Sequence, residues 1–232
     1  MSCILLLETA TKVCSVAISE NGKLLALKES HSANSHSSVI TTYVSEVMSV
    51  SGKNQSNIDA VCVSMGPGSY TGLRIGVSTA KGLCYAWNKP LIAINTLLSM
   101  ALHFLSEHSR QHHSDALLCP MIDARRMEVY NAIFDLNGNF IRDTSAEIIT
   151  ENSFSGSLQK QKIIFFGDGA GKCKEILSLH KNAVIIYDFL NSANGMLSPA
   201  FLKYQFKQFE NTAYFEPYYL KDFIATKPKK LI

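Results

Sequence analysis

The chain has 232 residues, enough for one large domain or two small lobes, and 47% of them are hydrophobic, 9% aromatic and 18% charged. This composition excludes a disordered chain. The formal net charge of +3 and the pI near 8.5 are too mild for a protein that binds nucleic acid by charge alone, so any contact with RNA needs a partner.

The cysteine pattern and the N-terminal sequence indicate a cellular compartment. Six cysteines are scattered singly, mostly in apolar runs, which favours buried thiols in a reducing environment over a disulfide framework or a zinc site. The first apolar run has no basic residues before it and breaks at Glu8, so we expect neither a signal peptide nor a membrane span. These features together predict a cytoplasmic protein.

The first hundred residues predict an antiparallel meander followed by alternating helices and strands. Three strand-like runs come first, and the last two flank Asn21 and Gly22, which supply the positive φ angles of a tight hairpin. Apolar residues then recur every three or four positions over 35–51, which predicts a helix. Two nearly continuous apolar runs, at 58–65 and 90–95, are typical of parallel strands covered on both faces.

The remaining residues predict a second lobe. We expect a helix over 96–108, strands at 116–123, 127–134 and 162–167, and a late helix from Ser198 and Pro199 to about Phe209. The order of elements is that of an α/β protein in the actin, Hsp70 and sugar-kinase class, with two lobes that each hold a mixed β-sheet flanked by helices. We assign residues 1–100 to the first lobe and 101–232 to a smaller second lobe, whose C-terminal helix returns to the first.

The glycine-rich segment Gly66–Leu83 follows a predicted strand, a position where glycines often hold phosphate. The spacing of a P-loop is absent, however, and the third glycine of a dinucleotide fingerprint falls one position late, at Gly72. The free N–H groups at the start of the helix still offer a place for an anion. If an anion or nucleotide binds, the residues nearest to it are Glu8, Thr9, Ser69, Thr71 and Arg74.

The same glycines also suit close packing along a helix that begins near Ser69. Leu73 and Val77 begin a core stripe, and an adjacent stripe consists mostly of small residues. A glycine inside a helix costs about 1 kcal/mol relative to alanine, so we expect a close neighbour that offsets the loss. That neighbour is either the preceding helix of this chain or, if the two helices form a groove together, a helix of another protein.

Several stretches resemble the TsaB (YeaZ) family: "GPGSYTGLRIGVSTAKGLCYA", the opening "ILLLETATKVCSVAI", "IDARRMEVYNAIF" and "EPYYLK". The resemblance implies a two-lobed actin-like fold and a non-catalytic, dimerising subunit of the bacterial machinery that makes threonylcarbamoyladenosine in tRNA. It implies a TsaD-like catalytic paralogue and a TsaE-like ATPase as partners, a homodimer when the chain is alone, and contact with tRNA mainly through the complex. The expected interface residues are Val39, Tyr43, Val47, Gly72, Ile75, Gly76, Thr79 and Leu83.

The alternative is a self-contained ATP-using or metallopeptidase-like enzyme of the same superfamily. Kinases of that superfamily carry D-x-G-[ST] in the first hairpin, where this chain has Glu8-Thr9-Ala10-Thr11, so we interpret Glu8 as the end of a strand rather than a ligand. The catalytic paralogue binds its metal through H-x-x-x-H, whereas His31 and His36 are five apart. We therefore predict no catalytic residue, no metal and no cofactor.

Two further segments contain residues typical of phosphate contacts. "FGDGAGKC" at 166–173 lacks the spacing and the hydroxyl residue of a Walker motif, which favours a strand-to-helix turn in the second lobe. Arg125 and Arg126 lie in a predicted connection between two strands, and they suit either contacts with RNA or partner phosphates or ordinary surface salt bridges. The sequence leaves these two interpretations of the arginines open.

Overall fold

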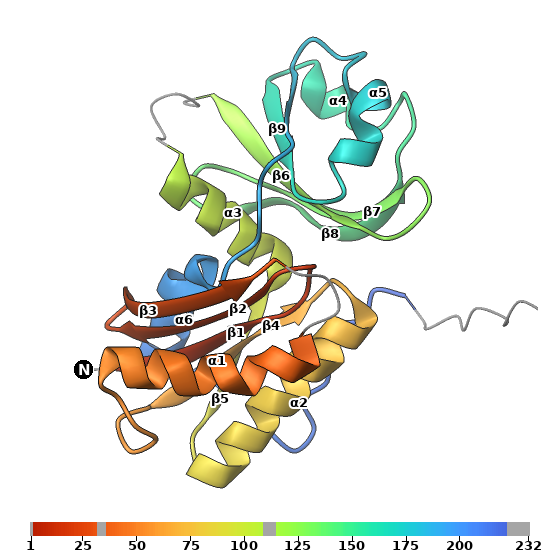
Figure 1. The fold of residues 1–232 in the computed structure, drawn as a ribbon. Coiled ribbons are helices and arrows are strands. Elements are labelled where there is room, and N and C mark those ends of the chain that lie inside the picture. The colour runs from red at the N-terminus through yellow and green to blue at the C-terminus, as the bar shows by residue number, and fades with distance from the viewer. Residues whose placement is uncertain (1, 32–35, 109–114, 222–232) are drawn as a thin grey trace, which may run out of the picture.

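The computed structural model describes residues 2–31, 36–108 and 115–221, and in these residues each of two lobes holds one five-stranded sheet (Figure 1). The first sheet has the order β3-β2-β1-β4-β5, with β1 (Cys3–Glu8), β2 (Cys14–Glu20), β3 (Lys23–Ser30), β4 (Ala60–Gly66) and β5 (Leu91–Asn95). The second has the order β8-β7-β6-β9-β10, with β6 (Ala116–Asp123), β7 (Glu128–Phe134), β8 (Phe140–Ile148), β9 (Lys162–Phe166) and β10 (Ala183–Ile186).

The two sheets repeat one topology. In each, the first three strands form an antiparallel meander and the last two run parallel to the first strand. This arrangement confirms the expected α/β architecture of two mixed sheets flanked by helices. The edge strand β10 was not expected, because its residues are half-buried or exposed and lack a buried apolar run.

Helices cover both faces of the first sheet (Figure 1). α1 (His36–Ser51) and α2 (Tyr70–Trp87) pack on one face with Leu5 and Leu7, whereas Ile4 and Leu6 point to the other face. There they meet η3 (Ala193–Met196) and α6 (Leu197–Gln205). Because successive residues of β1 face two apolar layers, the strand is apolar throughout, as expected for a strand covered on both faces.

The second sheet is covered in the same way. α3 (Thr96–Glu107) packs on one face, and α4 (Ser155–Leu158), η2 (Gly171–Cys173) and α5 (Lys174–Leu177) pack on the other. α3 directly follows the first sheet but packs on the second, whereas η3 and α6 follow the second sheet but pack on the first. The chain thus crosses between the lobes twice, and we count 191–221 with the first lobe.

Helix ends follow local capping. α2 begins next to Ser69, as expected, and the Ser69 side chain caps it by accepting a hydrogen bond from the N–H of Gly72. α6 begins one residue before the expected Ser198, because it continues a 3-10 turn that Ser192 caps. It ends at Gln205 rather than near Phe209, and two residues later Lys207 adopts the left-handed conformation, with φ of 53°.

All six cysteines are buried and free, as their placement in apolar runs predicts. Burial raises the pKa of the Cys14 and Cys84 thiols to about 11. In the ranges that the structure describes, no helix combines the length and apolar character needed to cross a membrane.

Candidate partner interface and interlobe cleft

The glycines of α2 pack against the loop that follows β1. A Cβ added to Gly76 would lie 2.2 Å from the hydroxyl of Thr9, and one added to Gly72 would lie 2.1 Å from the backbone oxygen of Thr9. The Thr9 hydroxyl donates a 2.8 Å hydrogen bond to the Gly72 carbonyl. The close neighbour of the small-residue stripe is therefore the first hairpin loop, and neither helix one nor a second protein is needed to explain these glycines.

This packing corrects the expected interface. Gly72 and Gly76 are buried, and Val47 is fully buried with Ile40 and Val44 on the inner side of α1. Val47 belongs to the inner stripe because it continues the three- and four-residue spacing of that stripe. The structure does not place these three residues on a surface that a partner can reach.

The other expected interface residues remain partly exposed, and we call them, together with Gly82, the α1–α2 surface. Its residues are Val39 and Tyr43 on α1 and Ile75, Thr79, Gly82 and Leu83 on α2. The four large apolar members pack their inner side on the core of the first lobe and are otherwise open to solvent. Gly82 is exposed, and nothing lies within 4 Å of a Cβ added there. α1 and α2 lie together on the face of the sheet away from α6 (Figure 1).

A cavity of about 350 Å³ lies between the lobes. Its walls are Ala10, Thr11, Lys12, His36, Ser37, Ser69, Thr71, Gly72, Ile75, Ile122, Asp123 and Asp168. The first-lobe wall combines the Lys12 ammonium with the N-terminal ends of α1 and α2, and the second-lobe wall carries two carboxylates. Of the residues expected near an anion, Ser69 and Thr71 line this cavity.

Glu8 lies beneath the loop that borders the cleft. It is fully buried, its Oε1 accepts a 2.7 Å hydrogen bond from the N–H of Ala10, and its Oε2 has no partner among the described residues. Burial raises the pKa of this carboxyl to about 7. Glu8 thus ends a strand and closes a turn, in agreement with the sequence-based interpretation, and Thr9 is likewise fully buried.

In the second sheet, the last residue of β6 is also acidic, but this carboxylate reaches the cleft. Asp123 pairs with Lys172, whose ammonium also donates a 2.6 Å hydrogen bond to the Glu128 carbonyl. Burial raises the pKa of Asp123, but the hydrogen bonds from Lys172 and from the N–H of Arg125, together with the charges of Lys172 and Lys12, outweigh burial, so the pKa is lowered. Lys172 is thus held inside its own lobe, and the segment 166–173 is the expected strand-to-helix turn.

Two cleft residues were not identified from the sequence. Asp168 accepts a 3.0 Å hydrogen bond from the N–H of Asp123, and burial, followed by the charge of Asp123, raises its pKa. Lys12 lies opposite, on the loop after β1. The available signal was topological. Lys12 follows β1, which runs parallel to β4, and Asp168 follows β9, which runs parallel to β6. The carboxyl ends of parallel strands border the ligand clefts of α/β folds.

Arg74 lies outside the cleft, contrary to its expected place beside an anion. Its guanidinium lies 4.2 Å from the centre of the Tyr70 ring, and its Nε lies 3.4 Å from the hydroxyl of Tyr219. The rings of Tyr70 and Tyr219 are 5.0 Å apart. Arg74 therefore holds the C-terminal segment against α2.

Arg125 and Arg126 are exposed in the turn between β6 and β7, with positive φ angles of 71° and 50°. Neither guanidinium forms an ion pair with the residues that the structure describes, so the salt-bridge interpretation has no support among those residues. His36 Nε2 lies 3.0 Å from the Thr11 carbonyl, and His31 is exposed. No three His, Cys, Asp or Glu residues of the described ranges gather as metal ligands would.

Known proteins resemble this chain over more than half of its length. The tRNA threonylcarbamoyladenosine biosynthesis protein TsaB of Escherichia coli (strain K12) is 34% identical over 138 residues, which cover 60% of this chain and 57% of that protein. The tRNA N6-adenosine threonylcarbamoyltransferase of Staphylococcus saprophyticus is 28% identical over 164 residues, which cover 64% of this chain and 47% of that protein. The match thus spans about half of each relative.

The solved structure described as YeaZ from Pseudomonas aeruginosa has the same fold, with a TM-score of 0.79 at 24% identity, and the match covers 95% of this chain and 100% of that chain. The sequence model of the family described as "TsaD: tRNA N6-adenosine threonylcarbamoyltransferase" matches residues 30–228. The chain therefore belongs to this family, among its TsaB and YeaZ members.

Proposed function

We propose that this chain is a non-catalytic subunit of the bacterial machinery that forms N6-threonylcarbamoyladenosine in tRNA, and that it binds and orders a TsaD-like catalytic paralogue. Three TsaB relatives are named as tRNA threonylcarbamoyladenosine biosynthesis proteins, and these names support a role of this chain in that biosynthesis. The observation that carries the docking role is the α1–α2 surface, which combines partly exposed apolar side chains from two adjacent helices with an exposed glycine on α2. Such a surface suits the close approach of helices from another protein.

The geometry of the first hairpin supports a structural rather than a catalytic role. The Glu8 carboxylate is bonded to the backbone of its own loop and covered by it. The His36 imidazole is directed at the carbonyls of Thr11 and Val13. These side chains stabilise the loop that packs against α2, and through it they position the helix that carries four of the six residues of the α1–α2 surface.

The proposal includes the other expected partners. A TsaE-like ATPase joins the assembly of this chain with its paralogue, and tRNA is held mainly by that assembly in the cytoplasm. When the paralogue is absent, the same α1–α2 surface forms a homodimer. Arg125 and Arg126, which are exposed and unpaired with the described residues, are available to phosphate groups of RNA or of a partner.

The test is a substitution on the α1–α2 surface. Leu83→Arg and Tyr43→Arg each place a charge on the surface without filling the core, and we expect each to weaken co-purification with a TsaD-like paralogue from the same genome at least tenfold. The control is Leu179→Arg, which places the same charge at a leucine of the second lobe that is 66% exposed. Wild-type binding by Leu83→Arg and Tyr43→Arg would contradict the docking role. Gly76 is unsuitable for this test because its substitution clashes with Thr9.

The alternative of a self-contained enzyme has a separate test. Calorimetry of the isolated chain with ATP and magnesium, and with zinc, measures whether either ligand binds without a partner. Tight binding of either would contradict the non-catalytic role while leaving the docking surface to be judged by the substitutions above.

A further inference from the structure

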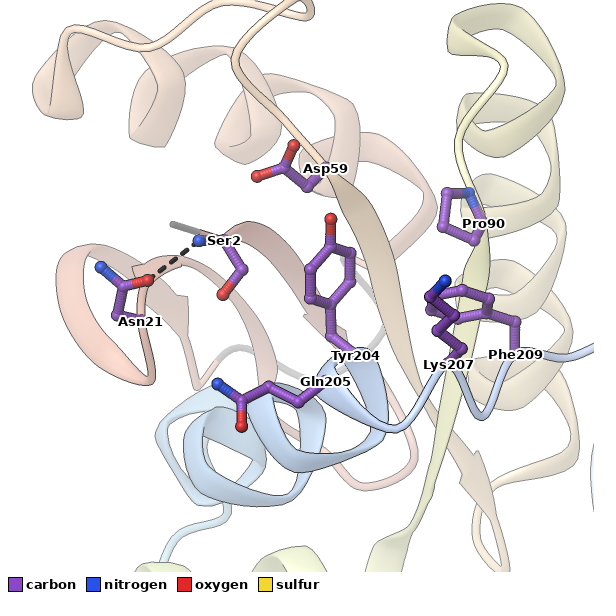
Figure 2. Close-up of a pocket in the computed structure, with 8 residues that line it drawn as sticks. All are labelled: Ser2, Asn21, Asp59, Pro90, Tyr204, Gln205, Lys207 and Phe209. Carbon is purple, nitrogen blue, oxygen red and sulfur yellow. Dashed lines mark hydrogen bonds between the residues drawn. The ribbon is translucent and has the colours of Figure 1, made fainter.

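A second cavity, of about 370 Å³, lies at the end of the first lobe opposite the interlobe cleft (Figure 2). Three of its lining residues directly precede strands: Ser2 precedes β1, Asp59 precedes β4 and Pro90 precedes β5. The others come from the β2–β3 turn and from the end of α6 and the residues after it, and they are Asn21, Tyr204, Gln205, Lys207 and Phe209. The volume is near the lower end of the range of about 300–1,000 Å³ typical of ligand pockets.

Polar groups of this cavity are only partly used by the protein. The side chain of Ser2, a residue only 3% exposed, has no hydrogen-bond partner for its Oγ in the described part of the chain. Buried hydroxyls are nearly always bonded to protein or to a bound molecule. Asn21 accepts a hydrogen bond from the N–H of Ser2, and Asp59 Oδ2 accepts one from the N–H of Cys3. The second carboxylate oxygen of Asp59 forms no hydrogen bond with the residues that the structure describes.

The hydroxyl of Tyr204 and the carboxylate of Asp59 lie on the same side of the cavity (Figure 2). Burial and then the charge of Asp59 raise the pKa of Tyr204, yet no hydrogen bond joins the two side chains. A group with several N–H donors, placed between them, would bond to both. An ammonium group has this capacity and also neutralises the carboxylate.

Lys207 lines the other side of the cavity, beside Pro90 and Phe209 (Figure 2). The backbone of Lys207 is in the left-handed conformation, with a φ of 53°. Glycine adopts this conformation more easily than lysine does. Neither Lys207 nor Asp59 forms an ion pair with the described residues. One cavity thus presents two opposite charges that do not pair with each other.

We propose that this cavity binds a small zwitterion of the α-amino acid type. Its ammonium group binds between Asp59 and Tyr204, its carboxylate binds Lys207, and its side chain lies against Pro90 and Phe209. Asp59 is half-buried and Lys207 is exposed, so a zwitterion is the small ligand that offers an opposite charge to each of them, whereas a ligand with one charge meets only one of the two. The inference is independent of the docking role of α1 and α2, which lie on the other face of the sheet from α6.

The test is a calorimetric titration of the full chain with L-serine, L-valine and L-phenylalanine. Ethanolamine supplies the ammonium alone, acetate the carboxylate alone, and glycerol neither charge. We expect at least one amino acid to bind with a Kd of about 1 mM or tighter. We expect Asp59→Asn, which keeps an acceptor for the N–H of Cys3, and Lys207→Met each to weaken that binding at least tenfold. Lys160→Met, at an exposed site of the second lobe, is the matched control and should leave it unchanged.

Three results would overturn the proposal. The first is no binding of any of the three amino acids at about ten times that concentration. The second is binding of ethanolamine, acetate or glycerol as tight as that of the amino acids. The third is binding that Asp59→Asn weakens but Lys207→Met does not, since the site would then recognise the ammonium alone. Because the isolated chain is used, each of these results leaves the test with the paralogue unaffected.

Discussion

The hydroxyl of Thr9 donates its hydrogen bond to the carbonyl of Gly72 and at the same time occupies the space that a side chain at position 76 would need. One residue of the first hairpin loop therefore accounts for two glycines of α2. The loop borders the interlobe cleft, and α2 supplies four of the six residues of the α1–α2 surface. Substitutions at this contact should show how much it contributes to the stability of the packing between the loop and α2.

Gly72→Ala should destabilise the chain strongly. The added Cβ would lie 2.1 Å from the backbone oxygen of Thr9, so either the loop or the helix has to move. We expect the free energy of unfolding, measured by urea denaturation, to fall by about 2–3 kcal/mol. A loss of less than about 0.5 kcal/mol would show that the loop yields easily.

Gly76→Ala should behave differently when Thr9 is also changed. The added Cβ meets the hydroxyl of Thr9 at 2.2 Å, and that atom is absent from the Thr9→Ala variant. We expect Gly76→Ala to cost about 1–3 kcal/mol in the wild-type background and clearly less in the Thr9→Ala background. Gly72→Ala is the matched comparison, because its clash is with backbone and Thr9→Ala cannot relieve it. Equal relief of both glycine variants would contradict this account.

Gly82→Ala should stabilise the chain. Gly82 is exposed on α2 and nothing lies within 4 Å of an added Cβ, so only the helix propensity changes. We expect the free energy of unfolding to rise by up to about 1 kcal/mol, with a matching increase in Tm. A decrease would mean that the backbone at this position is strained in a way that the helix geometry does not show.

The arrangement of strands was largely predictable, because strands buried on both faces are nearly continuous apolar runs and Asn21-Gly22 marks a hairpin. β10 was missed because its residues lie at an edge and are half-buried or exposed, so their pattern is weak. The end of α6 was placed too late because the left-handed turn at Lys207 uses a residue that gives no glycine-like signal.

The candidate sites were less predictable. Periodicity identified the small-residue stripe of α2 but not its neighbour, because Thr9 and Gly72 are 63 positions apart in the sequence. Periodicity also gives no sign of the cavity that Asp59 and Lys207 line, since its lining comes from separate segments before the strands and after α6. Sequence spacing shows which residues share one element, whereas contacts between elements depend on the packing of the whole lobe.

Tyr219→Ala should loosen the C-terminal segment. Tyr219 packs on Tyr70 with ring centres 5.0 Å apart and lies within 3.4 Å of the Arg74 guanidinium. We expect a loss of about 0.5–1.5 kcal/mol in the free energy of unfolding and faster hydrogen exchange at the N–H of Tyr218, which bonds to Met65. Tyr214→Ala is the control, because that side chain is 83% exposed and should change neither quantity. Equal effects of the two substitutions would contradict the role of the Tyr219 contact.

Glu8→Gln should remove a pH-dependent loss of stability. The pKa of this carboxyl is near 4.5 when solvated and about 7 when buried in the folded chain. Below both values the group is protonated in the folded and unfolded states, so burial imposes no electrostatic cost. Between them the unfolded chain loses its proton first, and the free energy of unfolding falls by about 1.4 kcal/mol per pH unit, to a total of about 3 kcal/mol above the higher value.

The glutamine amide keeps an oxygen that can accept from the N–H of Ala10 and does not titrate. We therefore expect Glu8→Gln and wild type to have similar urea midpoints near about pH 4.5, and the variant to become the more stable as the pH rises to about 8. Glu175→Gln, at an exposed site on α5, is the matched control and should follow the wild-type curve. If the difference in urea midpoint between Glu8→Gln and wild type stays constant across this range, burial does not raise the pKa of Glu8. The Glu8 side chain would then affect stability through packing alone.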